Sequence, residues 1–388
     1  MRLSASMEHS TPISKGARRS MREQEGFIPV GEYRVWYRIV GGGADHENTP
    51  LLTLHGGPGI PHDYIIDMAA LASETRRVIF YDQLGCGRSD QPNDPSLWTI
   101  ERSVEEIGIV RRALGLEKVH LWGQSFGGLF ALEYALTQPE GLVSLILASS
   151  TPSIPLWIVE ANRLREALPP DVQATLVRHE QAGTTDDPEY LQAMMVFYER
   201  HVIRIKPIPE HVQQAMDQVG QVYYTMNGPS EFHVIGTIKD WDRTDRLSEI
   251  HVPTLITSGS YDESTPLINE VLHKGIAGSE WVLFEHRTDY LISIRHHHWR
   301  WVEREDFLWR HQPYFGFMLV KQLKAAIEKV AVLFHVLLNP LTVLKLFILN
   351  IARIATNAIN MNDHINTRIK EQVTFICNLC LPRIRGVF

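Results

Sequence analysis

The residues best suited to covalent chemistry form the pentapeptide GQSFG at positions 123–127, with Gly128 directly after it. The pentapeptide has the pattern G-x-S-x-G, follows the apolar run VHLW and precedes the helix-like stretch LFALEYAL. A serine in a sharp strand-to-helix turn has its Oγ pushed out of the chain, and glycines beside it let neighbouring backbones approach. We therefore predict Ser125 as a nucleophile. An ordinary glycine-rich turn with an incidental serine is the alternative.

A second glycine-rich segment, HGGPG at positions 55–59, closes an earlier apolar run and suits a loop that binds an oxyanion. The N–H of Gly57 and the N–H of Phe126 would together stabilise the negative oxygen of a tetrahedral intermediate. Removing one such donor costs about 3 kcal/mol of barrier. A simple Gly-Pro turn is the alternative for this segment.

An acid that accompanies a serine and a histidine is expected downstream of the nucleophile. Asp262 follows LITSGSY at the end of a predicted strand, and this placement favours it as the acid over a plain turn former. The segment DQLGCGRSD at 82–90 is predicted to be a structural turn. Its Cys86 is predicted to be a buried packing residue, because the sequence shows no base to partner the thiol.

The elements that must position these residues are short apolar runs, each followed by a glycine-rich or polar loop. They read PLLTLH, RRVIFYD, KVHLWG and LVSLILAS, and later VPTLITSGSYD and SEWVLFEH. Such runs are typical of buried strands in a mostly parallel sheet. Helix-like stretches such as TIERSVEEIGIVRRALGL alternate with them, so the fold class is α/β. Residues 26–43 alternate apolar and polar side chains and predict a β-hairpin.

The chain divides by composition into five predicted parts. They are a disordered polar lead (1–25), the first part of the core (26–150), a mainly helical lid (151–245), the second part of the core (246–312) and an atypical apolar C-terminal extension (313–388). The extension contains twenty apolar-rich residues at 330–349, interrupted by polar residues and a proline. This stretch fits a packed or surface-lying helix, a membrane anchor, or sequence foreign to the functional protein.

Composition limits the partners and the compartment. The formal net charge of -7 argues against nucleic acid as the main partner. Three cysteines, Cys86, Cys377 and Cys380, make no disulfide framework and favour a reducing, cytoplasmic setting. The last two have the spacing C-x-x-C, but no second pair completes a zinc site, so neither a metal nor a cofactor is predicted.

Several segments together resemble the prolyl iminopeptidase family of α/β-hydrolases, which includes related amino-acid amidases. They are HGGPG, DQLGCGRSD, WGQSFGG, NGPSEFHVIGTIKDWD and GSYDESTP, and the resemblance runs from about Gly26 to His286. The resemblance implies an α/β-hydrolase fold, a mostly parallel sheet flanked by helices, with an inserted helical lid. It also implies that Glu231 and Glu263 hold the free α-amino group of the substrate. Carboxylates suit a cation that leaves water, although two solvated surface glutamates are the alternative.

The general base is the one group that the resemblance does not supply. The family pattern F-E-H-S-S-H has its base at the second histidine, whereas this chain reads FEHRTD at 284–289 and has Asp289 there. An inserted loop would move the base to His297 or His298. His286 is a further candidate, and loss of the true C-terminus is the remaining possibility. Without its histidine, a serine triad loses about a million-fold in turnover.

We therefore predict a serine hydrolase that releases an N-terminal residue, preferentially proline, from small peptides or amides through an acyl-enzyme. An esterase, lactonase or amidase acting on a small metabolite is one alternative. A catalytically impaired, amine-binding protein that lacks the family histidine is the other. The sequence predicts no oligomeric state.

Overall fold

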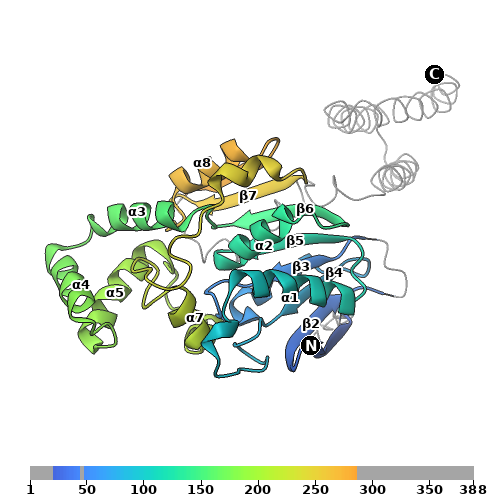
Figure 1. Ribbon diagram of the computed structural model, residues 1–388, viewed down its shortest axis with the longest axis horizontal. Coiled ribbons are helices and arrows are strands. Elements are labelled where there is room, and N and C mark those ends of the chain that lie inside the picture. The colour runs from blue at the N-terminus through green and yellow to red at the C-terminus, as the bar shows by residue number, and fades with distance from the viewer. Residues whose placement is uncertain (1–20, 44–47, 286–388) are drawn as a thin grey trace, which may run out of the picture. The chain divides into compact units, whose positions relative to one another are not determined.

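The computed structural model describes residues 21–43 and 48–285. The described part contains an eight-stranded sheet in the order β1-β2-β4-β3-β5-β6-β7-β8 (Figure 1). All pairings from β3 to β8 are parallel, and the predicted α/β class is confirmed. The predicted lead up to residue 20, the C-terminal extension, Cys377 and Cys380 lie outside the described residues.

The predicted hairpin is present as β1 (Glu23–Val30) and β2 (Tyr33–Gly41), which pair antiparallel. The first strand begins at Glu23, so the predicted end of the disordered lead at residue 25 is wrong. Glu23 and Glu25 extend the hairpin because Arg38 on β2 lies 2.7 Å and 3.7 Å from their carboxylates. The last residues assigned to the polar lead, Glu23 to Glu25, therefore belong to the first strand.

The predicted apolar runs form the remaining strands. These are β3 (Leu51–Leu54), β4 (Arg77–Tyr81), β5 (Val119–Gln124), β6 (Leu142–Ala148), β7 (Thr254–Gly259) and β8 (Glu280–Phe284). Every residue of β3, β5 and β7 is buried. A strand covered on both faces has no solvent side, which explains why these runs are apolar throughout instead of alternating.

Helices pack on this sheet through their apolar sides. α2 (Phe126–Leu136) lies on β5 and β6, α1 (Ile100–Ala113) packs against α2, and α8 (Pro266–Gly275) packs on β7 and β8. α2 is buried almost along its whole length, as its sequence FGGLFALEYAL requires. The described residues also include three 3₁₀ helices: η1 (His62–Leu71), η2 (Pro95–Leu97) and η3 (Thr244–Glu249).

A helical segment between β6 and β7 corresponds to the predicted lid. It contains α3 (Ile154–Arg165), α4 (Pro170–Ala182), α5 (Pro188–His201), α6 (Glu210–Met216) and α7 (Gln221–Met226), drawn in green to yellow in Figure 1. Its two ends lie side by side, because Ser153 and Asp242 form a β-bridge and the Ser153 hydroxyl donates to Asp242 at 2.7 Å. Arg243 then binds Glu133 of α2, which ties the lid to the core.

No helix within residues 21–43 and 48–285 has both the length and the apolar character needed to cross a bilayer. The apolar stretch at 330–349 lies outside the described residues. A membrane anchor stays one of the three alternatives for that stretch, and the cytoplasmic setting stays a prediction.

Candidate active site

Ser125 occupies a strained turn between β5 and α2. Its backbone has φ 51° and ψ -120°, a region that a residue with a side chain rarely adopts. The turn is held from both sides: the Ser125 N–H donates to the Ala148 carbonyl at 2.9 Å, and the Ser125 carbonyl accepts from Gly128 N–H at 2.9 Å. The predicted strand, sharp turn and helix are all present around the serine.

The two outer glycines of the motif are required by contact distances. A Cβ on Gly123 would lie 2.2 Å from the Gly127 carbonyl oxygen. A Cβ on Gly127 would lie 2.2 Å from the carbonyl oxygen of Leu54 on β3. Both distances are far below van der Waals contact, so the turn around Ser125 forms only with glycine at these positions.

Asp262, the predicted acid, is buried directly after β7. Its carboxylate accepts hydrogen bonds from the Ser149 hydroxyl at 2.6 Å, from Ser264 N–H at 2.8 Å and from Gly259 N–H at 3.1 Å. Sequence reasoning did not identify Ser149, which follows β6. Because β6 lies between β5 and β7, the ends of these three strands bring Ser125, Ser149 and Asp262 to one edge of the sheet.

The predicted oxyanion loop lies against the serine turn. A Cβ on Gly56 would lie 3.0 Å from the Cβ of Ser125, so only glycine allows this approach. Gly57 has φ +113° and lines the same cavity as Ser125. Phe126, the second predicted donor, is the first residue of α2 and borders Ser125 on its other side. The placement agrees with an oxyanion hole, whose function stays a prediction.

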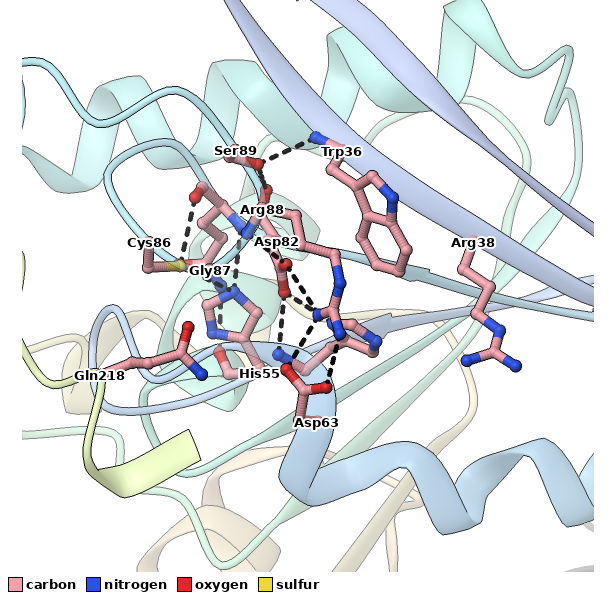
Figure 2. A network of polar contacts seen from close by, with 12 residues as sticks. Trp36, Arg38, His55, Asp63, Asp82, Cys86, Gly87, Arg88, Ser89 and Gln218 are labelled. Carbon is pink, nitrogen blue, oxygen red and sulfur yellow. Dashed lines mark hydrogen bonds and ion pairs between the residues drawn. The ribbon is translucent and has the colours of Figure 1, made fainter. Parts of the chain in front are cut away.

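The buried His55, labelled in Figure 2, begins the predicted oxyanion loop and is held by hydrogen bonds on both ring nitrogens. His55 Nε2 accepts from Gln83 N–H at 3.0 Å, which places the ring proton on Nδ1. His55 Nδ1 then donates to the Gly56 carbonyl at 3.2 Å. Burial lowers the pKa of His55 to about 4, so the ring stays neutral and keeps this arrangement at neutral pH.

Cys86 also contacts this imidazole in Figure 2, so the premise that it has no base nearby is wrong. Its Sγ lies 3.5 Å from His55 Nε2. Burial raises the pKa of the thiol well above its usual value, and burial lowers that of the imidazole. Proton transfer from thiol to imidazole is therefore opposed at both ends, and the packing role predicted for Cys86 fits the structure.

Other residues of the segment 82–90 bind His62 and Asp63, which follow the predicted oxyanion loop in the sequence. Asp82 binds His62 Nδ1 at 2.7 Å and accepts from Arg88 N–H at 2.9 Å. Burial by itself would raise the pKa of Asp82, but the hydrogen bond and charge of His62 outweigh it and lower that pKa to about 2. The Arg88 guanidinium pairs with Asp63 at 2.9 Å, as Figure 2 shows.

Glu231 and Glu263 line one cavity of about 200 Å³ together with Ser125 and Gly57. Their exposed fractions are only 8% and 2%, so the alternative of two solvated surface glutamates is wrong. Glu231 comes from the lid and Glu263 from the loop after β7. The structure therefore brings the predicted nucleophile and both predicted amine-binding residues to one buried place, from three separate parts of the chain.

Tyrosines complete the acidic end of the cavity, and sequence reasoning did not identify them. The Tyr223 hydroxyl donates to Glu231 Oε1 at 2.9 Å, and Glu231 N–H donates to the Tyr198 hydroxyl at 3.3 Å. Burial is the largest cause that raises the pKa of both tyrosines well above the usual value, and the charge of Glu231 is the second. The lid also supplies apolar lining, from Leu191, Met194, Val202, Ile203, Met216 and Val219.

The candidate bases His286, His297 and His298 lie outside the described residues, as does Asp289. The end of β8 lies close to the loop that carries Asp262, because Ser260 N–H donates to the carbonyl of Phe284, the last residue of β8, at 3.1 Å. Ser260 is two residues before Asp262. The choice of base stays a prediction.

One group of potential metal ligands occurs among the described residues. His179, Asp187 and Glu189 in the lid bring ligand atoms within 4.8 Å of one another. Arg178, however, already pairs with Glu189 at 2.6 Å, and His179 Nδ1 contacts Thr184 Oγ1 at 2.8 Å. These residues form an ion-pair and hydrogen-bond network in the lid and do not line the cavity, and we assign no metal to them.

A comparison with protein-family models identifies the structural class of this chain. Residues 49–307 match the family model described as "alpha/beta hydrolase fold", which confirms the predicted fold. The match continues past His286, where the resemblance by motifs ends, and includes His297 and His298.

The relatives are more specific. A proline iminopeptidase of Saccharolobus solfataricus is 41% identical over 292 residues, which are 74% of this chain and 91% of that protein. One of Lactobacillus acidophilus is 42% identical, covering 73% and 99% of the two chains. Among solved structures, a proline iminopeptidase of Mycobacterium smegmatis (39% identity, 74% and 98% covered) has a TM-score of 0.68. VinJ (37% identity, 74% and 98% covered) has a TM-score of 0.70. This chain belongs to the prolyl iminopeptidase family of α/β-hydrolases.

Proposed function

We propose that this prolyl iminopeptidase-type hydrolase uses Ser125 to release an N-terminal residue, preferentially proline, from small peptides or amides through an acyl-enzyme. The observation that carries the proposal is the cavity in which Ser125, Glu231 and Glu263 meet. A protonated amine that leaves water needs carboxylate partners, and a blocked N-terminus cannot supply the positive charge. The cavity therefore favours substrates with a free N-terminus.

The proposed reaction assigns a step to each of these residues. The substrate amine binds to Glu231 and Glu263, and Ser125 Oγ attacks the adjoining carbonyl carbon while a histidine takes the hydroxyl proton. The N–H groups of Gly57 and Phe126 stabilise the oxyanion. The histidine returns the proton to the leaving amine, and water then hydrolyses the acyl-enzyme. Asp262, fixed by three hydrogen bonds, orients the histidine.

For the base we propose His297 or His298. Both lie within the range that matches the family model, and the loop before them absorbs extra residues cheaply, since doubling a loop costs only about 0.6 kcal/mol. The catalytically impaired, amine-binding protein stays the second candidate, because Asp289 takes the position where the family pattern has its histidine.

Hydrolysis of a proline arylamide tests this function. We expect turnover by the wild type and labelling of Ser125 by a fluorophosphonate probe, and Ser125→Ala should lose both. Proline arylamide should also be cleaved faster than an N-acetylproline arylamide or a simple acyl ester. A wild type that is neither labelled nor active would support the impaired, amine-binding alternative, and faster ester cleavage would support an esterase.

The variants His286→Ala, His297→Ala and His298→Ala identify the base in the same assay. Loss of the base should lower kcat by several orders of magnitude, about a million-fold in the limit. The two histidine variants that do not remove the base serve as controls for each other. If all three variants kept the wild-type rate, the base assignment would be wrong.

A further inference from the structure

The direction of the Gly57 N–H depends on the peptide unit that it shares with the Gly56 carbonyl. In a trans peptide the N–H and the C=O point in opposite directions. The Gly56 carbonyl accepts from Ile60 N–H at 3.2 Å and from His55 Nδ1 at 3.2 Å. These two donors hold the carbonyl on one side of the loop, and so they keep the Gly57 N–H on the opposite side.

The other end of Gly56 is held by a tyrosine. Gly56 N–H donates to the Tyr64 hydroxyl at 2.5 Å. Tyr64 lies on η1, is only 4% exposed, and its hydroxyl donates in turn to Oε1 of Gln124. Gln124 is the residue directly before Ser125. One hydroxyl thus connects the predicted oxyanion loop to the turn that carries the predicted nucleophile.

We propose that Tyr64 is a positioning residue that sets the distance between the oxyanion donor of Gly57 and Ser125. The inference rests on the proposed function and deepens it. A hydroxyl suits this place because it accepts one hydrogen bond and donates another at the same time. A phenylalanine fills the same space but offers neither, so Gly56 N–H and Gln124 Oε1 lose a partner in a buried setting.

The expected effect lies in the chemical step. Tyr64→Phe should lower kcat for proline arylamide about ten- to a hundred-fold, less than the 10²–10³-fold lost when an oxyanion donor is removed outright. KM should stay within about two-fold, because the carboxylates that bind the amine are untouched. Labelling of Ser125 by a fluorophosphonate should slow by a similar factor, since that reaction also places an oxygen in the oxyanion hole.

Tyr134→Phe is the matched control. Tyr134 is a buried tyrosine of α2 whose hydroxyl accepts from Arg111 at 2.8 Å, at the end of the helix away from Ser125. It should lower Tm about as much as Tyr64→Phe and leave kcat and labelling unchanged. A change that only restores the Tm of Tyr64→Phe should restore neither its kcat nor its rate of labelling.

Amide hydrogen exchange gives a readout that does not depend on turnover. The Gly56 amide should be protected in the wild type and in Tyr134→Phe, and should exchange faster in Tyr64→Phe. Unchanged exchange at Gly56, unchanged kcat and labelling in Tyr64→Phe, or a loss confined to KM would each overturn the positioning role. If the wild type is labelled but does not cleave proline arylamide, the proposed function fails, and the labelling and exchange comparisons still decide the role of Tyr64.

Discussion

At the scale of single residues, burial separates the carboxylates of the cavity from the many acidic side chains at the surface. Glu231 and Glu263 are almost fully buried. They are unusual in this respect, because the chain carries 45 acidic residues against 38 basic ones and charged side chains are mostly exposed. Burying a charge is costly unless a partner compensates it. Tyr223 supplies one hydrogen bond to Glu231, and a substrate amine would supply the opposite charge.

Neutralising either glutamate should therefore weaken the recognition of a free amine. We expect Glu231→Gln and Glu263→Gln each to lower kcat/KM for proline arylamide about a hundred-fold, since truncating one partner of a buried charge pair costs about 2–5 kcal/mol. Cleavage of N-acetylproline arylamide should change little, so the preference for a free N-terminus should narrow. Steady-state kinetics on the two substrates measures this ratio.

Glu180→Gln is the control for these variants. Glu180 is a lid carboxylate that pairs with Arg165 at 3.0 Å and does not line the cavity. Its loss should affect both substrates equally. A parallel fall for both substrates in Glu231→Gln or Glu263→Gln would contradict an amine-binding role.

The contact between Cys86 and His55 illustrates that proximity alone does not make a nucleophile and base. The thiol and the imidazole are 3.5 Å apart, yet burial opposes the charged form of each. Ser125 differs because it lines an accessible cavity and occupies a turn that projects its side chain. Accessibility and backbone strain, more than distance, distinguish the predicted nucleophile Ser125 from Cys86.

At the scale of elements, the connection between β5 and α2 depends on close packing of backbone on backbone. Gly127 lies against the carbonyl of Leu54 on β3, so the turn, the helix and the neighbouring strand form one contact. The same contact brings the loop after β3 next to Ser125. The predicted nucleophile and the predicted oxyanion loop are therefore positioned by the same packing of backbone on backbone.

Gly127→Ala should disrupt this packing. The added methyl group would meet the Leu54 oxygen at 2.2 Å, and relieving such overpacking costs about 3 kcal/mol. We expect the free energy of unfolding, measured by urea denaturation, to fall by about this amount, together with activity. Gly220→Ala is the control, because its Cβ would have no neighbour closer than 3.8 Å. Equal stability of the two variants would show that the turn relaxes without cost.

At the scale of the whole molecule, two buried groups near the predicted oxyanion loop, His55 and Asp82, link stability to pH. His55 is buried in its neutral form with a pKa of about 4, so between pH 6.5 and 4 the unfolded chain binds a proton that the folded chain does not. Asp82 has a folded pKa of about 2, so the unfolded chain also binds the extra proton between pH 3.8 and 2. Both groups make the folded state less stable as pH falls.

The free energy of unfolding should therefore decrease by about 3 kcal/mol through His55 alone as pH falls from 6.5 to 4. Asp82 should remove a further 2 kcal/mol or so below pH 4. Urea denaturation between pH 7 and pH 4 measures the first change. Gln at position 55 stays neutral at every pH, so in His55→Gln the fall in the free energy of unfolding over this range should be smaller by about 3 kcal/mol. An identical slope in wild type and variant would show that His55 does not carry the effect.

Sequence by itself determined the features that depend on neighbours along the chain. The strands from β3 to β8 followed from apolar runs. Those buried on both faces, such as β3, β5 and β7, admit few polar residues. The turn at Ser125 followed from its glycines, because only glycine avoids the clash at positions 123 and 127. The start of β1 was misjudged, because the partner of Glu23 and Glu25 is Arg38, on the following strand.

Only the tertiary structure decided which distant residues meet. Ser149 reaches Asp262 because β6 and β7 are neighbours in the sheet, and Tyr64 joins Gly56 to Gln124. Glu231 is buried beside Tyr198 and Tyr223, which come from helices α5 and α7 of the segment between β6 and β7. None of these contacts leaves a periodic pattern in the sequence, since each joins residues from separate elements. Spacing along one element is set by local backbone geometry, whereas the depth and polarity of a cavity depend on side chains that meet only after folding.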